Sequence, residues 1–163
     1  MTTQYYLNDT DNEIKLFIYN ELSKCNSLFQ SCYDINEIDL SNLNTSIATS
    51  MKQIFADCFS VTSLNLSNLD TANVKDMSLM FYGLSSLSSL NVSGLDTSQV
   101  TNMLGMFYNC SSLVFLNLTN FNTSKVENMR AMFAWCDKLK SKDLSSFDTS
   151  NVNVWAECSM VAN

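Results

Sequence analysis

The chain has 163 residues, of which 46% are hydrophobic and 15% are charged, so it can bury the core of one domain and is not a disordered segment. Its formal net charge of −7 argues against nucleic acid or an anionic membrane surface as the main partner. Histidine is absent, which removes the commonest general base and metal ligand.

The N-terminal segment, residues 1–30, is predicted to contain a capping helix. Between residues 12 and 29 apolar side chains recur at helical spacing, and Asp11 or Asn12 can cap the helix N-terminus. These apolar residues are Ile14, Phe17, Ile18, Leu22, Cys25 and Leu28. We expect this helix to cover the first repeat, because a stack of repeats exposes its core at both ends. An amphipathic helix that binds a partner is the alternative.

The first residues, MTTQYYLNDTDNEIKL, show no basic stretch followed by an apolar run, so they do not predict a secretory signal. No apolar stretch approaches the roughly 20 residues that a membrane helix needs, and we expect no membrane insertion. If the reading frame is complete, the sequence predicts a cytoplasmic protein.

A unit of 26 residues recurs without gaps through most of the chain. The full copies cover residues 43–68, 69–94, 95–120 and 121–146, a degenerate copy covers 17–42, and a truncated copy fills 147–163. We therefore expect about five full repeats, with the leucine-rich repeats proper at 31–146 and a C-terminal cap at 147–163.

Each unit has two parts with different spacing of apolar residues. The V-x-x-M-x-x-M-F part spaces them by three and four, which predicts one or two helical turns. The L-x-x-L-x-L part alternates, as in Leu113, Leu116 and Leu118, which predicts a short strand. Because every strand is reached through the helical side, the strands must be parallel. The expected fold is an α/β solenoid, a right-handed leucine-rich-repeat-like stack with a curved sheet.

The unit resembles the repeat of the BspA-like leucine-rich-repeat family of bacterial surface proteins, over roughly residues 43–154 and more weakly from 17. The residues that match the family pattern in one copy are Phe121, Thr123, Ser124, Val126, Asn128, Met129, Met132, Phe133, Cys136, Leu139 and Leu144. The resemblance implies a surface or secreted module for adhesion and binding, without enzymatic activity. The residues show no pattern that would predict the signal or lipoprotein anchor expected of such a surface protein.

One column of the repeat holds cysteine in four copies, at Cys32, Cys58, Cys110 and Cys136, and Leu84 in another. No C-x-x-C pair of the kind found in zinc sites occurs. Stacked Cβ vectors run parallel, which is poor geometry for a disulfide. Because leucine fills the same slot, we expect buried free thiols, no metal and no cofactor. The methionine and phenylalanine columns are expected in the core.

The outward face of the strands is the candidate binding site. It is rich in hydroxyl and amide side chains, and Phe115 interrupts a column of small polar residues, so it could anchor a protein ligand. The residues expected there are Glu37, Asp39, Ser63, Asn65, Ser89, Asn91, Phe115, Asn117, Ser141 and Asp143. A merely solvated sheet face is the alternative.

At the C-terminal end, Lys142 occupies a column that is otherwise apolar and inward. A charge there can guard an edge strand, so strand 139–144 is expected to be the last, closed over by 152–160 with Trp155. Acidic residues crowd the first repeats and basic residues the last full one, which could favour head-to-tail association, although scattered surface charge is the alternative.

Three functions stay open from the sequence. The first is a non-enzymatic protein that binds protein ligands through the concave strand face. The second is a structural spacer or a fragment of a larger repeat surface protein. The third, an enzyme or a thiol or metal protein, has no acid–base pair, activated nucleophile or phosphate loop in its favour.

Overall fold

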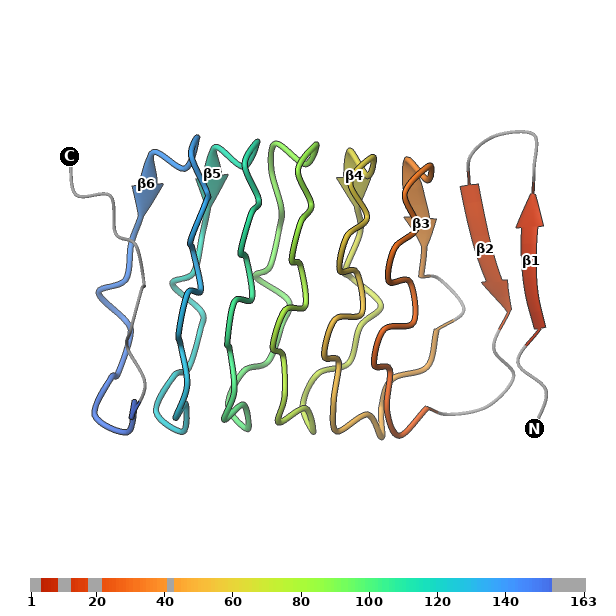
Figure 1. Ribbon diagram of the computed structural model, residues 1–163. Coiled ribbons are helices and arrows are strands. Elements are labelled where there is room, and N and C mark those ends of the chain that lie inside the picture. The colour runs from red at the N-terminus through yellow and green to blue at the C-terminus, as the bar shows by residue number, and fades with distance from the viewer. Residues whose placement is uncertain (1–3, 9–12, 18–21, 41–42, 154–163) are drawn as a thin grey trace.

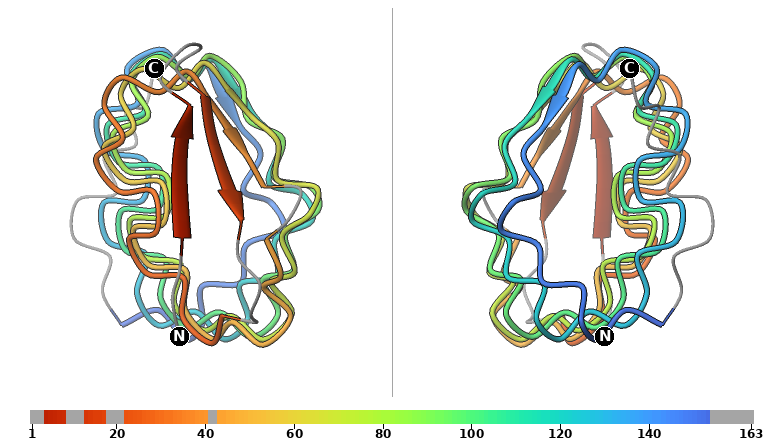
Figure 2. Two further views of the ribbon diagram at one scale, coloured as in Figure 1. Left: turned by 90° about the vertical axis from the view of Figure 1, so that its right-hand side faces the viewer. Right: turned by 90° about the vertical axis from the view of Figure 1, so that its left-hand side faces the viewer.

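The computed structural model of the chain describes residues 4–8, 13–17, 22–40 and 43–153. Consecutive repeats lie side by side along one axis (Figure 1). We call them rungs, numbered 1 to 5 from 17–42 to 121–146. Viewed along that axis the rungs superpose, with short strands on one side and a run of turns on the other (Figure 2). The strands are β1 (Gln4–Asn8), β2 (Glu13–Phe17), β3 (Glu37–Asp39), β4 (Ser63–Leu64), β5 (Phe115–Leu116) and β6 (Ser141–Lys142).

Residues that pair between neighbouring rungs are separated by the repeat period found in the sequence. Strands β3 and β4 are parallel and pair Ile38 with Leu64, and β5 and β6 are parallel and pair Leu116 with Lys142. On the other side, isolated parallel bridges join Ser50 to Asp76 and Asp76 to Asn102. All of these partners lie 26 residues apart, which confirms the predicted repeat and the parallel strands.

The predicted capping helix is wrong. Residues Glu13–Phe17 form β2, which pairs antiparallel with β1 and parallel with β3, so a hairpin continues the sheet beyond rung 1. An unpaired strand edge offers a row of N–H and C=O groups that another strand can bond and a helix cannot. The stretch Glu-Ile-Lys-Leu-Phe also alternates in the manner of a strand. Further along the predicted helix, Asn26–Gln30 forms turns.

The short helix predicted in each rung is also wrong, and the described residues contain no helix. In rung 2 the N–H groups of Ile54, Ala56 and Cys58 donate to carbonyls three residues back. The odd-numbered N–H groups of the same segment point across the stack. Those of Met51, Gln53, Phe55 and Asp57 donate to carbonyls of rung 3 at 2.8–3.1 Å. We call this alternating segment, with its equivalents in the other rungs, the turn ladder.

The spacing of the rungs explains why turns replace helices. Paired strands lie about 4.8 Å apart, whereas a helix with its side chains is about 10 Å wide. One helix per rung could therefore not follow the strand spacing unless the stack fanned out into an arc. With turns on that side, both sides advance by the same step, and Figure 1 shows the rungs in a nearly straight row. The expectation of a curved sheet is therefore not met in this view.

The turn ladder needs two residues with positive φ in each rung. In rung 2 these are Gln53 (φ 59°) and Asp57 (φ 61°), and in rung 3 Leu79 and Gly83. A side chain in this region costs about 1–2 kcal/mol, and glycine avoids that cost. At Gly105 a Cβ would also approach Cδ2 of Leu79 to 2.7 Å. A left-handed residue reverses the helical sense of the turn, so the segment cannot continue as an α-helix.

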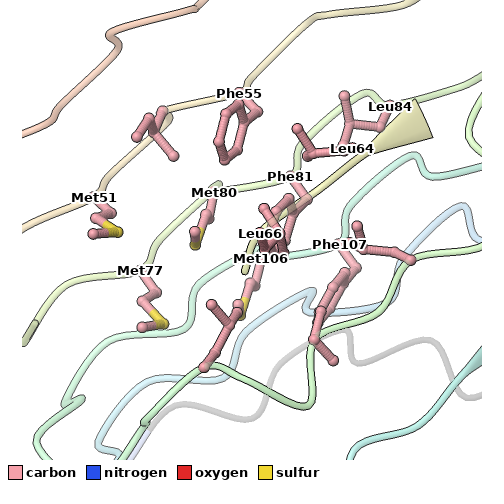
Figure 3. Packing of buried hydrophobic residues seen from close by; sticks show 14 of the residues in the cluster. Met51, Phe55, Leu64, Leu66, Met77, Met80, Phe81, Leu84, Met106 and Phe107 are labelled. Atoms are coloured by element: carbon pink, nitrogen blue, oxygen red, sulfur yellow. The ribbon is translucent and has the colours of Figure 1, made fainter. Parts of the chain in front are cut away.

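The core consists of side-chain columns that run through the rungs, as predicted. Met51, Met77 and Met103 follow one another, and so do Phe55, Phe81 and Phe107, all with 0% exposed surface. Figure 3 shows the methionine and phenylalanine columns beside each other. The phenylalanine rings stack from rung to rung with centroids 5.5–5.9 Å apart.

A column of buried threonines bonds the rungs together. The hydroxyl of Thr97 donates to the carbonyl of Asn122 at 3.0 Å and accepts the N–H of Asn122 at 2.8 Å. Thr45 makes the same pair of bonds with Asp70. The hydroxyls of Thr71 and Thr123 donate one rung onward in the same way. Threonine suits this column because its buried hydroxyl can act as both donor and acceptor toward the backbone of the next rung.

The cysteine column is part of the same bonding. Cys58 Sγ donates to the carbonyl of Phe29 at 3.0 Å, and Cys110 and Cys136 bond the phenylalanine carbonyl one rung back in the same way. The described cysteines are free thiols, with Cys25, Cys58 and Cys110 buried and Cys32 and Cys136 half-buried. Burial raises the pKa of Cys25 to about 11 and raises the pKa of Cys110 further. The prediction of free, largely buried thiols is confirmed for these residues.

Two predictions about the C-terminal end concern residues that the structure describes only in part or not at all. Lys142 lies in β6 opposite Leu116, but its side chain is outside the description. Of the predicted C-terminal cover 152–160, residues 154–160, with Trp155, lie outside the described residues.

Thr97→Val is expected to lower the free energy of unfolding by about 1–3 kcal/mol, because the N–H and the carbonyl of Asn122 both lose their partly buried bond to the hydroxyl. Thr149→Val is the matched control, since Thr149 has the same place in the repeat and is exposed. Urea unfolding of both variants measures the difference. An equal effect of the two substitutions would contradict the role given to the buried column.

Stability is expected to fall as the pH rises above about 8.5, the ordinary thiol pKa in the unfolded chain. The folded-state pKa values of Cys25 and Cys110 are raised, so the unfolded chain loses protons that the folded chain keeps. Cys110→Leu, which copies Leu84 one rung earlier, should make this decline shallower. Urea midpoints between pH 7 and pH 10 test it, and identical pH profiles for wild type and variant would refute it.

Candidate functional site

The exposed side chains on the strand side of the rungs form the candidate site, which we call the strand face. One row of expected residues is brought together by the strand register: Glu37 pairs with Ser63, Ser89 with Phe115, and Phe115 with Ser141. Glu37, Ser63, Ser89 and Phe115 are all exposed. The side chain of Ser141 is outside the description.

The second expected row has a structural role in addition to its exposure. Asn65, Asn91, Asn117 and Asp143 are exposed, and each accepts through Oδ1 the N–H of the residue two positions on, at 3.0–3.1 Å. The hydroxyls of Ser93 and Thr119 add bonds of 2.8 Å to the same oxygens. Hydrogen bonds from Ser145 hold the pKa of Asp143 below its usual range. Asp39, the first member of this row, is half-buried.

These bonds decide what the second row can offer a ligand. The oxygen of each asparagine is used to hold the turn after the strand, so its Nδ2 donors are the groups left for a partner. The row therefore presents mainly hydrogen-bond donors in fixed positions.

An apolar pair stands out on the strand face in rung 4. The side chain of Phe115 is 60% exposed and that of Val114 is 38% exposed. Both lie between Leu113 and Leu116, which point into the core, and the two residues at the same positions are exposed in rungs 1 to 3 as well. Val114 was not among the expected site residues. The signal was present, because its column otherwise holds Asn36, Thr62, Ser88 and Lys140.

A second group of aromatic residues, three exposed and two half-buried, lies at the end of the turn ladder and was also missed. Tyr33 stacks on Phe59 with ring centroids 5.4 Å apart, and Tyr82 stacks on Tyr108 at 5.3 Å. Trp135 is 64% exposed. We call these five residues the aromatic edge. They occupy three repeat columns within a span of four, so an alignment of the repeats could have revealed them.

The aromatic edge has a carboxylate beside it. Burial raises the pKa of Asp57, whose Oδ1 would lie 3.0 Å from a Cβ placed on Gly83. Burial, with Asp57 and Tyr108 nearby, raises the pKa of Tyr82. Asp57 is therefore partly desolvated beside these rings, which disfavours its charged form.

The described residues contain no group of three or more cysteine, aspartate or glutamate residues placed to hold a metal ion. No helix with the length and hydropathy of a membrane span occurs among them.

Comparison with known proteins gives one similar solved structure and one family. A leucine-rich repeat protein of T. pallidum is 16% identical over 84% of this chain, with a TM-score of 0.49, and the match spans 66% of that protein's chain, just under two thirds. No curated protein matches the chain. A family model described as "Mycoplasma protein of unknown function, DUF285" matches residues 1–114 and 87–160. Since these two matches together span nearly the whole sequence, the chain belongs to this family.

Proposed function

We propose that the protein is a non-enzymatic module that binds other proteins through the strand face. The observation that carries the proposal is the exposed pair Val114 and Phe115 in a field of serine, threonine and asparagine. Protein interfaces typically place an aromatic or aliphatic anchor at the centre of a patch whose surroundings are polar.

The backbone beneath the pair favours binding because it is already ordered. Each rung is bonded to the next through the strands, the threonine column and the turn ladder. A partner that docks on this surface does not have to order the backbone, so less of the interaction free energy is lost to conformational entropy. The asparagine row adds donors whose positions are fixed by their own turns.

Binding is favoured over catalysis by the chemistry available on this face. The chain has no histidine, and the amide oxygens of the second row already accept backbone bonds. By the resemblance to BspA-like surface proteins, the proposal places this binding at a cell surface or outside the cell.

A second candidate is a structural spacer within a longer repeat protein. The even spacing of the stacked phenylalanine rings, 5.5–5.9 Å through five rungs, favours it, because a spacer needs regular rungs and no special surface. On this view Val114 and Phe115 would be chance departures from their columns.

Peptide-library selection against the folded protein distinguishes the two candidates. We expect the selected binders to compete with one another and to bind the double variant Val114→Ala, Phe115→Ala about 30-fold more weakly, as for the loss of a central anchor. Fluorescence polarisation with the individual binders measures this.

Trp135→Ala is the matched control, because Trp135 is as exposed as Phe115 and lies on the turn ladder. Its affinities should stay within twofold of wild type. Binders that depend on Trp135 and ignore Phe115, or a library that yields none, would remove the strand face from the proposal and leave the spacer.

A further inference from the structure

Charge and polarity change in order along part of the strand face. One column, in the turn that leads into the strand side of each rung, holds Asp34, Ser60, Ser86, Ser112 and Lys138 from rung 1 to rung 5. The two columns next to the inward leucines add Glu37 in rung 1, serine and threonine in rungs 2 and 3, Val114 and Phe115 in rung 4, and Lys140 in rung 5. We call these three columns the graded strip. The charged members Asp34, Glu37, Lys138 and Lys140 are all exposed.

The backbone bonds place these rungs in sequence at a fixed step. The N–H of Thr62 donates to the carbonyl of Asn36 at 3.2 Å, that of Val114 to Ser88 at 3.0 Å, and that of Lys140 to Val114 at 3.2 Å. With about 4.8 Å per rung, the acidic end lies about 14 Å from the apolar pair, and the basic end about 5 Å beyond it.

The order belongs to the graded strip and not to the whole face. In the neighbouring column Asp39 and Asp143 put a carboxylate in both the first and the last rung. The Oδ1 atom of Asp143 accepts the N–H of Ser145 at 3.0 Å, so part of that carboxylate is occupied by its own turn. A ligand that recognises the order of acidic, apolar and basic residues must therefore lie over the graded strip.

We infer that the graded strip binds an extended polypeptide segment with a basic group, an apolar side chain and an acidic group in that order. The basic group would lie over Asp34 and Glu37, the apolar side chain on Val114 and Phe115, and the acidic group over Lys138 and Lys140. This rests on the proposed function and names the partner's chemistry. An extended chain advances about 3.3 Å per residue, so the basic and apolar groups are about four residues apart and the acidic group one or two residues further.

The apolar pair lies much closer to the basic end of the strip than to the acidic end. Two peptides of the same composition but different order can therefore test the inference. The matched peptide is Lys-Lys-Ser-Thr-Ser-Leu-Phe-Glu-Glu, and the mismatched peptide is Lys-Lys-Phe-Leu-Ser-Thr-Ser-Glu-Glu, both with blocked ends and a fluorescent label. They have the same charge, the same charged ends and the same apolar residues. Only the matched peptide can reach both charged ends of the strip with its phenylalanine on Phe115.

Fluorescence polarisation at low ionic strength is expected to show the matched peptide binding about fivefold more tightly than the mismatched one. The double variants Asp34→Lys, Glu37→Lys and Lys138→Glu, Lys140→Glu should each weaken the matched peptide about tenfold. The difference should shrink as salt is added, because exposed charges are screened. Lys75→Glu and Glu127→Lys are the matched controls, since both residues are exposed and lie before the turn ladder; they should change affinity less than twofold.

Failure of this inference can be told apart from failure of the proposed function. Equal binding of the two peptides, with dependence on Val114 and Phe115, would overturn the charge order and leave the strand face as a binding site. The same holds if neither peptide binds while library-selected binders still require Phe115. Self-association in sedimentation velocity that is lost in the Lys138→Glu, Lys140→Glu variant would assign the graded strip to a second copy of the chain and overturn the peptide as its partner. If no peptide of either kind depends on Phe115, both proposals fall.

Discussion

The common step between neighbouring rungs is the constraint on which the rest of the structure depends. On the strand side the step is the ordinary distance between paired strands. The turn ladder keeps the same step on the other side, because alternate N–H groups bond the next rung while those between them close turns within their own. Helices are thereby excluded from this side, residues with positive φ are required twice in each rung, and the row of rungs stays nearly straight.

A constant step also explains why the interior is built from columns of one residue type. A side chain in rung 3 has as its neighbours the same column in rungs 2 and 4, so shape and hydrogen bonding must repeat. Phenylalanine rings stack on phenylalanine rings, and each threonine hydroxyl meets the backbone of the next rung. Exposed columns whose side chains hold no turn and bond no neighbouring rung can vary more freely. Departures there, such as Val114, Phe115 and the charged ends of the graded strip, are therefore where recognition can differ between related chains.

The period, the strands and the buried columns could be predicted from the sequence because they repeat with fixed spacing. The helices could not be excluded, since apolar residues spaced by three and four serve a chain of turns as well as a helical turn. The hairpin β1–β2 forms hydrogen bonds with the strand edge of rung 1. This pairing depends on a neighbouring strand, so the spacing of apolar residues around Ile14 could not predict it. Phe115 stands out in the sequence because it breaks a column of otherwise polar residues, and Val114 stands out by the same rule. The aromatic edge and the paired bonds of Thr97 depend on which neighbours the stack brings together.

The bonding of the turn ladder has a direction, since the N–H groups of this segment that leave their rung, such as those of Gln53 and Phe55, donate to the rung that follows in the chain, whereas those on the strand side, such as that of Thr62, donate to the rung before. The contacts between two rungs are therefore the same wherever in the row they occur. A whole unit of 26 residues can be duplicated or lost without creating a new kind of junction, whereas an insertion of one residue would move every column out of line. Evolution can thus lengthen or shorten this protein in whole rungs, and each new rung adds a strip of outer surface that is free to diverge.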